Sequence, residues 1–229
     1  MTTFTVKTKI LHAMLKSVAH AAAVKDARYY LNGIRLETEL HTLRLIATDG
    51  KRMAVAEMAV PDVVPGLAYT LGGNCKALIE TLGSELKKAK HCGPETFVTY
   101  VRGKFELCER RPGSEGPDKV RIEEPGKIIV ATKHGVSMGL ESQYPTMPST
   151  DIFPDWRRVD MKKDQLAPWG GNCQAVNADY LADACKAAGG LANQKYRGVR
   201  IHSQPSMCFV TVTSSDGIDY REIIMGMRD

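Results

Sequence analysis

The chain has 229 residues, of which 43% are hydrophobic and 25% are charged, a balance typical of one large or two small globular domains. No apolar run approaches the roughly 20 residues that span a bilayer, and the N-terminus lacks the apolar core of a signal peptide. The net charge of +5 permits a polyanionic partner, but no dense basic patch or DNA-reading module accompanies it. We therefore expect a cytoplasmic protein with no membrane segment and no sequence-specific DNA readout.

Alternating and helical patterns define a first β-α-β-β-β unit. Residues 4–9 alternate like a strand, and residues 10–23 carry an apolar helical stripe with Lys9, His12, Lys16 and His20 on the opposite side. The runs 31–36 and 43–48 then alternate, and an Asp49-Gly50 pair precedes a third run over 53–56. Asp-Gly between alternating runs predicts a hairpin with a type I′ turn, in which both central residues have positive φ.

A second unit follows the same plan. Residues 68–71 form a short strand, and Asn74 is placed to cap a helix that carries Leu78 and Leu82. Strands are predicted over 96–101, 104–108, 120–122, 128–132 and 136–140. We interpret residues 109–127 as an inserted hairpin or extended loop, since 111–118 have the composition of an exposed loop. Residues 144–154 read as a Pro- and Ser-rich connector.

The third unit is shorter. It contains a predicted strand over 173–176, a helix that Asn177 caps and Gly189-Gly190 ends, and strands over 198–202, 207–213 and 220–225. The chain therefore repeats β-α-β-β-β about three times. The expected class is α+β, with one domain of two units over residues 1–150 and a connector with a smaller half-domain over 151–229.

Catalytic and metal motifs are missing from the sequence. It contains no H-E-x-x-H, no G-x-S-x-G and no G-x-x-x-x-G-K-[ST], and its six cysteines show neither a C-x-x-C nor a metal-ligand spacing. A phosphate could sit on the Gly72-Gly73 turn before the second helix, but Gly-Gly commonly follows a strand. We expect no enzyme, no catalytic residue, no metal and no cofactor.

The segment YYLNGIRLE followed by LIATDGKRMAV resembles the middle domain of the bacterial β sliding clamp, the processivity subunit of DNA polymerase III. The resemblance returns in the same order at FPDWRRV (153–159), VNADYL (176–181), KYRGVR (195–200) and IIMGMR (223–228). Each match alone would fit a generic sheet, whereas five in order are specific. The resemblance is poor over residues 84–149. It implies a DNA-clamp fold with antiparallel sheets outside and helices inside, in a shortened form that lacks about a third of the usual chain.

The resemblance also implies a groove that accepts short linear peptides from polymerases and repair proteins. Such an apolar, Met-rich groove suits an extended peptide with Leu or Phe anchors. Lys51 stands where the family commonly has histidine, and Gly226 where proline is common. The matching positions are Leu31, Thr48, Gly50, Lys51, Arg52, Met53, Pro154, Arg158, Val159, Ile223, Ile224, Met225, Gly226, Met227 and Arg228. For Leu31, Ile223 and Ile224, a role in the core alone is an open alternative.

A second implied site is the helix face, which in clamps lies against duplex DNA. Basic side chains there would contact phosphates without reading sequence, so binding should be weak and sensitive to salt. Ordinary solubilising charge is an equally good reading of each position. The candidates are Lys9, His12, Lys16, Lys25, Arg28, Lys76 and Lys186.

Two functional hypotheses follow from the resemblance. The first is a sliding-clamp-like processivity factor that encircles double-stranded DNA as a homo-oligomer, a trimer or a tetramer, and tethers DNA polymerase and other proteins with clamp-binding peptides. An ATP-driven clamp loader would then be a required partner. The second is a clamp mimic that does not close a ring and acts as an adaptor or competitor for clamp-binding peptides.

Overall fold

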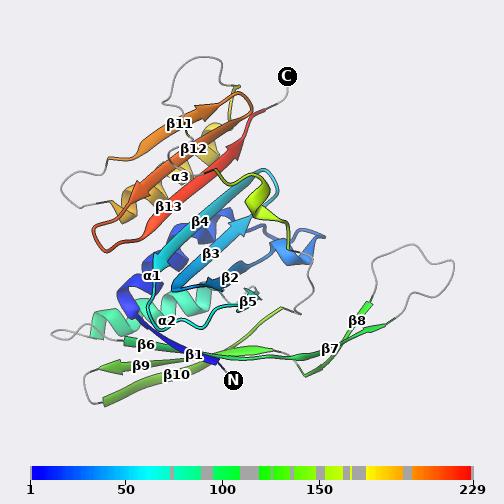
Figure 1. Cartoon of the computed structure of the whole chain (residues 1–229), viewed down its shortest axis with the longest axis vertical. Coiled ribbons are helices and arrows are strands. Elements are labelled where there is room, and N and C mark those ends of the chain that lie inside the picture. The colour runs from blue at the N-terminus through cyan, green and yellow to red at the C-terminus, as the bar shows by residue number, and fades with distance from the viewer. Residues whose placement is uncertain are drawn as a thin grey trace.

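The computed structural model describes residues 2–72, 75–88, 95–108, 119–124, 126–134, 137–147, 153–161, 166, 174–192 and 198–227. It contains three α-helices among these residues, short 3-10 turns and antiparallel strands (Figure 1). In chain order the elements are β1 (Thr2–Lys7), α1 (Thr8–Val18), η1 (Ala19–Ala21), η2 (Tyr29–Leu31), β2 (Ile34–Glu39), β3 (Thr42–Thr48), β4 (Arg52–Ala59), β5 (Ala68–Leu71), α2 (Cys75–Lys88), β6 (Glu95–Val101), β7 (Lys104–Cys108), β8 (Lys119–Glu124), β9 (Lys127–His134), β10 (Ser137–Pro145), η3 (Trp156–Arg158), α3 (Ala178–Leu191), β11 (Arg200–Gln204), β12 (Met207–Thr213) and β13 (Asp219–Met225).

The first two units exchange their leading strands. β1 leaves the first unit and pairs with β6 in a sheet of order β1-β6-β9-β10, while β5 leaves the second unit and pairs with β2 beside β3 and β4. The rings of Tyr69 on β5 and Tyr100 on β6 stack at 4.4 Å between centroids and so join the two sheets. This reciprocal exchange ties the two units together.

The third unit extends the sheet of the first. β13 pairs antiparallel with β4 from Asp219↔Glu57 to Ile224↔Arg52, which gives a seven-stranded sheet of order β11-β12-β13-β4-β3-β2-β5 (Figure 1). The last described strand therefore lies beside the first hairpin, as the groove prediction requires. The predicted domain boundary at residue 150 lies outside the described residues.

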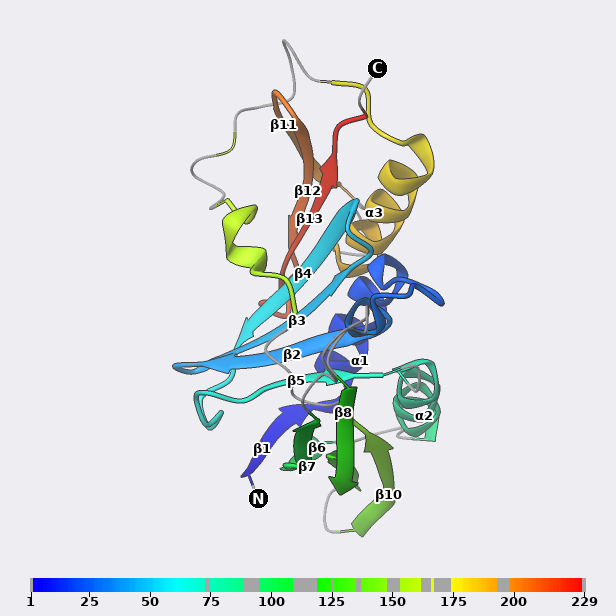
Figure 2. The ribbon, with the colours of Figure 1, turned by 90° about the vertical axis from the view of Figure 1, so that its right-hand side faces the viewer.

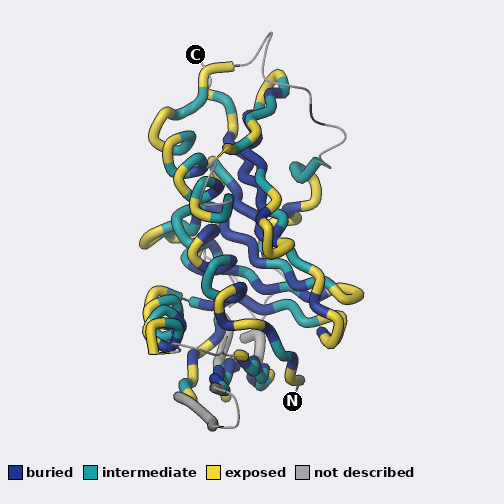
Figure 3. The backbone as a smooth tube through the Cα atoms, turned by 90° about the vertical axis from the view of Figure 1, so that its left-hand side faces the viewer, coloured by how far each residue is buried: buried dark blue, intermediate teal, exposed yellow. Residues whose placement is uncertain are grey.

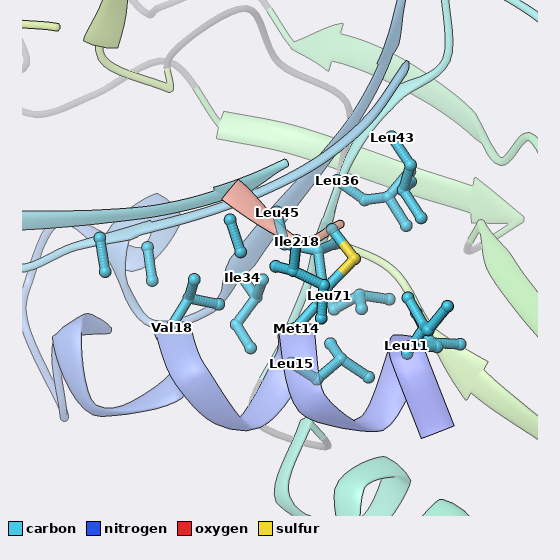
Figure 4. Close-up of a cluster of buried hydrophobic side chains, with 14 of the residues drawn as sticks. Leu11, Met14, Leu15, Val18, Ile34, Leu36, Leu43, Leu45, Leu71 and Ile218 are labelled. Atoms are coloured by element: carbon cyan, nitrogen blue, oxygen red, sulfur yellow. The ribbon is translucent and has the colours of Figure 1, made fainter. Parts of the chain in front are cut away.

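All three α-helices lie on one side of the sheets, whereas η3 lies on the other side of the seven-stranded sheet (Figure 2). The apolar stripe of α1 explains its position, because Leu11, Met14, Leu15 and Val18 are buried against the strands. Figure 4 shows these side chains beneath residues of β2 and β3. The predicted α+β fold, in which the α-helices lie on one side of antiparallel sheets, is confirmed.

Two apolar clusters form the core. The larger one lies between the helices and the sheets, and the smaller one lies on the opposite face of the seven-stranded sheet, beneath η3. Figure 3 shows burial concentrated along the central strands, while the helices expose much of their outer surface. The sheet around β4 and β13 is thus covered on both faces. No helix among the described residues is long and apolar enough to cross a membrane.

Several local predictions were wrong. Residues 29–31 form the 3-10 turn η2, so the strand begins at Ile34. In the Asp49-Gly50 turn only Gly50 has positive φ, because Asp49 accepts hydrogen bonds from the backbone N–H groups of Lys51 and Arg52 and forms a longer loop than type I′. Residues 174–176 are not a strand, and α3 runs through Gly189-Gly190 to Leu191.

Other local predictions hold or fall outside the described residues. Asn177 caps α3, since its Oδ1 accepts from the N–H groups of Asp179 and Tyr180. The predicted insertion over 109–127 is partly described: β8 lies within it and pairs antiparallel with β7. The predicted cap Asn74 and residues 109–118 lie outside the described residues.

Candidate functional site

The face of the β4–β13 junction that is turned away from the helices is called the outer face here. It is apolar because the strand residues that alternate onto it are hydrophobic. Met53 on β4, Ile223 on β13 and Phe209 on β12 point to the same face and form the smaller apolar cluster with Ile46 and Val55. Met53 and Ile223 are at most 5% exposed. These residues are the floor of the outer face rather than open contact surface.

The connector lies on this floor. Trp156 of η3 is 4% exposed, and its Nε1 donates to Glu37 Oε2 at 3.2 Å. The Arg157 guanidinium lies 4.4 Å from the centre of the same ring. Val159 and Phe153 pack against the cluster as partly buried side chains. Trp156 therefore anchors the segment that supplies the candidate residues Pro154, Arg158 and Val159, of which Pro154 and Arg158 are exposed.

Met225 points to the outer face, because it lies two residues after Ile223 in β13, and Met227 follows the end of that strand. Met225 is 42% exposed and Met227 is 53% exposed. Their positions are fixed by the backbone, since the N–H of Met225 donates to Lys51 O at 3.0 Å and that of Met227 donates to Ala175 O at 2.7 Å. A Cβ at Gly226 would lie 2.9 Å from Gln174 Cβ and 3.1 Å from Ser206 O, so a larger residue there would require these neighbours to shift. The segment after β13 therefore meets the β3–β4 hairpin at Lys51 and the segment before α3 at Ala175.

The hairpin before β4 completes the candidate face. Thr48 lies opposite Met53 in the ladder, and its hydroxyl donates to Arg52 O at 2.7 Å and accepts from the N–H of Gly50. Gly50 has φ +89°, and Gly50 and Lys51 are exposed. Of the predicted groove positions, those assembled here are Thr48, Gly50, Lys51, Met53, Pro154, Arg158, Val159, Ile223, Met225, Gly226 and Met227.

Three of the predicted groove residues that the structure describes are not brought to this face. Ile224 is fully buried in the larger cluster on the helix side, as its position next to Ile223 requires. Leu31 is 1% exposed in η2 and belongs to neither cluster. Arg52 also faces the helices, and Arg228 lies outside the described residues. For Leu31 and Ile224, the alternative of a buried role is the better reading.

Arg52 instead joins the hairpin to the helices. Its Nη1 donates to Asp183 Oδ2 on α3 at 3.0 Å, its Nη2 donates to His20 O at 2.7 Å, and its Nε donates to Asp49 Oδ2 at 3.2 Å. Its guanidinium also stacks 4.3 Å from the ring centre of Tyr180. Arg52 therefore positions the hairpin tip against η1 and α3.

The helix side carries a groove between α1 and α3 with a volume of about 500 Å³. Its walls include three lysines and two histidines, and Asp183 is the single carboxylate among them. Burial, followed by the charge of Lys16, lowers the pKa of His12 from its ordinary value. The predicted DNA-facing residues that line this groove are Lys9, His12, Lys16 and Lys186.

The other predicted DNA-facing residues lie outside this groove. Lys76 is exposed near the start of α2, and Lys25 is exposed with φ +57° in the loop after η1. Arg28 is held by Asp26, whose Oδ2 accepts from its Nη2 at 2.8 Å; hydrogen bonds from Arg28 lower the pKa of Asp26 to about 2. Within the groove, Lys9 is paired with Asp216 at 2.8 Å.

Sequence reasoning missed a buried polar cluster beneath the groove. Glu222 is fully buried, and its Oε2 lies 2.8 Å from His20 Nε2 and accepts from the Tyr220 hydroxyl at 2.5 Å. Burial and the neighbouring Glu222 raise the pKa of Tyr220 well above its ordinary value. The sequence did contain a signal for this cluster: Glu222 lies inside the apolar run of β13, and a buried carboxylate requires hydrogen-bonding partners.

Comparison with known proteins fits this geometry. Residues 5–70 match the family model of the DNA polymerase III beta subunit, central domain. The chain is 26% identical over 221 residues to the beta sliding clamp of Salmonella typhimurium and 25% identical to that of Escherichia coli K12, in each case over 96% of this chain. The chain is similar to the bacterial beta sliding clamps along almost its whole length.

The structural comparison shows the same fold. A DNA polymerase sliding clamp from Pseudomonas aeruginosa, solved with a ligand, superposes with a TM-score of 0.64 at 18% identity, over 100% of this chain and 67% of that one. The chain spans about half the length of the curated relatives it matches, since the aligned region covers 49% of those sliding clamps.

Proposed function

We propose that this sliding-clamp relative is a non-enzymatic processivity factor that encircles duplex DNA as a homo-oligomer and tethers a polymerase through the outer apolar face. The observation that carries the proposal is the division of the seven-stranded sheet into two different surfaces. One face carries the η3 connector and presents the exposed Met225, and the other carries the helices and their cationic groove.

The outer face suits an extended peptide with apolar anchors. Met225 and Met227 offer polarisable, adaptable surface at the edge of a packed apolar floor, and Lys51 and Arg158 add positive charge nearby. The described backbone hydrogen bonds hold the main chain of Met225 and Met227 in place before any ligand arrives, which limits the backbone entropy lost on binding. Peptides from DNA polymerase and from other proteins with clamp-binding motifs are the proposed partners.

The helix face suits sequence-independent contact with the phosphates of double-stranded DNA. Lys16 and Lys186 are exposed on opposite walls of the α1–α3 groove, and Lys9 and His12 extend the same surface. Flexible lysines that contact phosphates carry no base readout, as sliding requires.

If twelve units complete a ring, three units per chain give a tetramer, whereas a two-domain chain gives a trimer. A clamp loader would then open the ring around DNA.

A second candidate function rests on the length of the chain. Because it spans about half of its relatives, the chain could keep the peptide face and act as a non-ring mimic, an adaptor or a competitor for clamp-binding peptides. Both candidates require peptide binding, but only the first requires a topological link to DNA.

Fluorescence anisotropy with a labelled clamp-binding peptide tests the property that both candidates share. We expect saturable binding that Met227→Asp abolishes, whereas Leu40→Asp leaves it unchanged. Leu40 is 74% exposed at the β2–β3 turn, at the opposite end of β3 from Thr48, and so provides a matched exposed apolar control. Absence of binding by the folded wild-type chain would overturn both candidates.

A further inference from the structure

The exposed Met225 lies in a row of three residues that crosses the outer face. On one side, Met225 pairs with Met207 of β12. On the other side, its N–H donates to Lys51 O at 3.0 Å, which continues the β4–β13 ladder by one position and places Lys51 opposite Met225. Because the next residue, Arg52, faces the helices, Lys51 lies on the outer face by strand alternation. The row therefore runs from a half-buried methionine through an exposed methionine to an exposed lysine.

The turn before β4 fixes the backbone of Lys51 and leaves its charge free. Asp49 Oδ1 accepts from the N–H of Lys51 at 2.9 Å. Asp49 Oδ2 accepts from Arg52 Nε at 3.2 Å. The Asp49 carboxylate is thus engaged by the turn and by Arg52. Among the residues that the structure describes, the Lys51 ammonium has no carboxylate partner.

Arginines offset the carboxylates of the same face. Asp160 and Glu57 both lie against the guanidinium of Arg221. Glu37 accepts from Arg157 at 3.1 Å. The side chains of these three carboxylates are at most 27% exposed. Their negative charge is therefore offset within the protein and does not strongly repel an acidic ligand.

Arg158 is a second exposed cation of this face, but it has an acidic neighbour. Asp155 is exposed in the same connector, and its carbonyl oxygen accepts from the N–H of Arg158 at 3.2 Å. The carboxylate of Asp155 reduces the positive potential around Arg158. Lys51, by contrast, adjoins Met225 directly, and the nearby Asp49 is already engaged. Lys51 is therefore the charge best placed to act on a ligand that covers Met225.

We propose that Lys51 makes the outer face selective for apolar peptides that carry an acidic residue beside the anchor that covers Met225. Side chains of opposite residues in an antiparallel ladder lie about 5 Å apart, so a peptide anchor on Met225 places a neighbouring peptide side chain within reach of Lys51. A carboxylate at that position forms an ion pair, whereas a basic residue is repelled. This inference rests on the proposed peptide binding and names the class of peptide.

The exposure of Lys51 sets the size of this selectivity. Exposed ion pairs change an equilibrium constant by about two- to fivefold, and salt weakens them. The preference for an acidic peptide should therefore be about two- to fivefold at low salt. It should disappear at about 1 M salt, where charges are screened within about 3 Å.

Three peptides that differ at one position test the selectivity. A labelled clamp-binding peptide carries Asp, Asn or Lys at that position, and the position is moved in turn through the polar residues beside its apolar anchors. Fluorescence anisotropy with the wild type should give, for at least one position, affinities that fall from Asp to Asn to Lys by about two- to fivefold at each step. Binding with equal affinities at every position would overturn this inference and leave the proposed peptide binding intact. No binding of any peptide would overturn both.

Variants of Lys51 assign the selectivity to this side chain. Lys51→Gln removes the charge and should abolish the difference between the Asp and Asn peptides, and Lys51→Glu should reverse the order so that the Lys peptide binds best. Lys7→Gln removes an exposed lysine from β1, in the other sheet, and should keep the wild-type order. Circular dichroism checks that each variant is folded. A preference for Asp that persists in folded Lys51→Gln would overturn the assignment to Lys51.

Discussion

Arg221 on β13 forms a bidentate ion pair with Asp160, at 2.5 Å from Nε to Oδ1 and 2.6 Å from Nη2 to Oδ2. Asp160 directly follows Val159 in the connector, and both charged side chains are mostly buried, with exposed fractions of 10% and 16%. Glu57 on β4 lies 3.4 Å from the same guanidinium. The pair therefore fixes the connector to the junction between the first and last units, beside the proposed peptide face.

Replacing Asp160 should weaken both stability and peptide binding. Asp160→Ala leaves Arg221 mostly buried with a single remaining carboxylate, so we expect the free energy of unfolding to fall by about 2 kcal/mol. Asp155→Ala is a matched control, because Asp155 is exposed in the same connector. Urea unfolding of the two variants provides the measurement. A loss no larger for Asp160→Ala than for Asp155→Ala would contradict the anchoring role.

Trp156 should contribute more than any exposed connector residue. Trp156→Ala removes a ring that is 4% exposed on the floor of the outer face, so we expect a loss of about 3–5 kcal/mol. Trp156→Phe keeps the packing but removes the hydrogen bond to Glu37, and it should cost about 1 kcal/mol. Chemical denaturation of both variants distinguishes packing from hydrogen bonding. Similar losses for the two would show that the ring packing matters little.

Reversing one charge in the α1–α3 groove should weaken DNA binding. Lys16→Glu places a carboxylate where a phosphate is proposed to lie, whereas Arg200→Glu makes the same change on β11, outside this groove. We expect Lys16→Glu to reduce affinity for duplex DNA and to lower the slope of log K against log salt by about 1. Arg200→Glu should have a much smaller effect. Equal effects of the two variants would show that DNA binding depends on the net charge of the protein and not on this groove.

His12 should make stability depend on pH. Its folded pKa lies below the ordinary value of about 6.5, so the unfolded chain binds the proton more tightly. The stabilising contribution is therefore present above about pH 6.5 and is lost as the pH falls towards the folded pKa. Thermal unfolding at pH 7.5 and 5.5 should show a smaller pH effect for His12→Gln than for the wild type. An equal pH effect in His12→Gln and the wild type would contradict this role of His12.

The sequence predicted the elements better than the faces on which their side chains lie. Period-2 and helical patterns located α1, β3, β4, β12 and β13 because their apolar residues are buried. The pairing of β4 with β13 joins residues more than 160 positions apart, and no local pattern encodes it. That expectation came from the family resemblance.

The candidate peptide face shows the limit of transferring motifs. A contiguous match such as 223–228 cannot lie wholly on one face, because Ile223 and Ile224 necessarily point to opposite sides of the sheet. The same alternation separates Arg52 from Met53. The polar cluster of Glu222, His20 and Tyr220 depends on contacts between distant elements, so it could not be read from composition or spacing.

Retention on closed circular duplex DNA tests the proposed encirclement of DNA by this chain. After incubation with a clamp loader and ATP, labelled protein should remain on the closed circle at a salt concentration that disrupts simple electrostatic binding. Linearising the same circle should release it, because a ring slides off free ends. Equal retention before and after linearisation, or none on the circle despite intact peptide binding, would contradict encirclement, and the second outcome would favour the non-ring mimic.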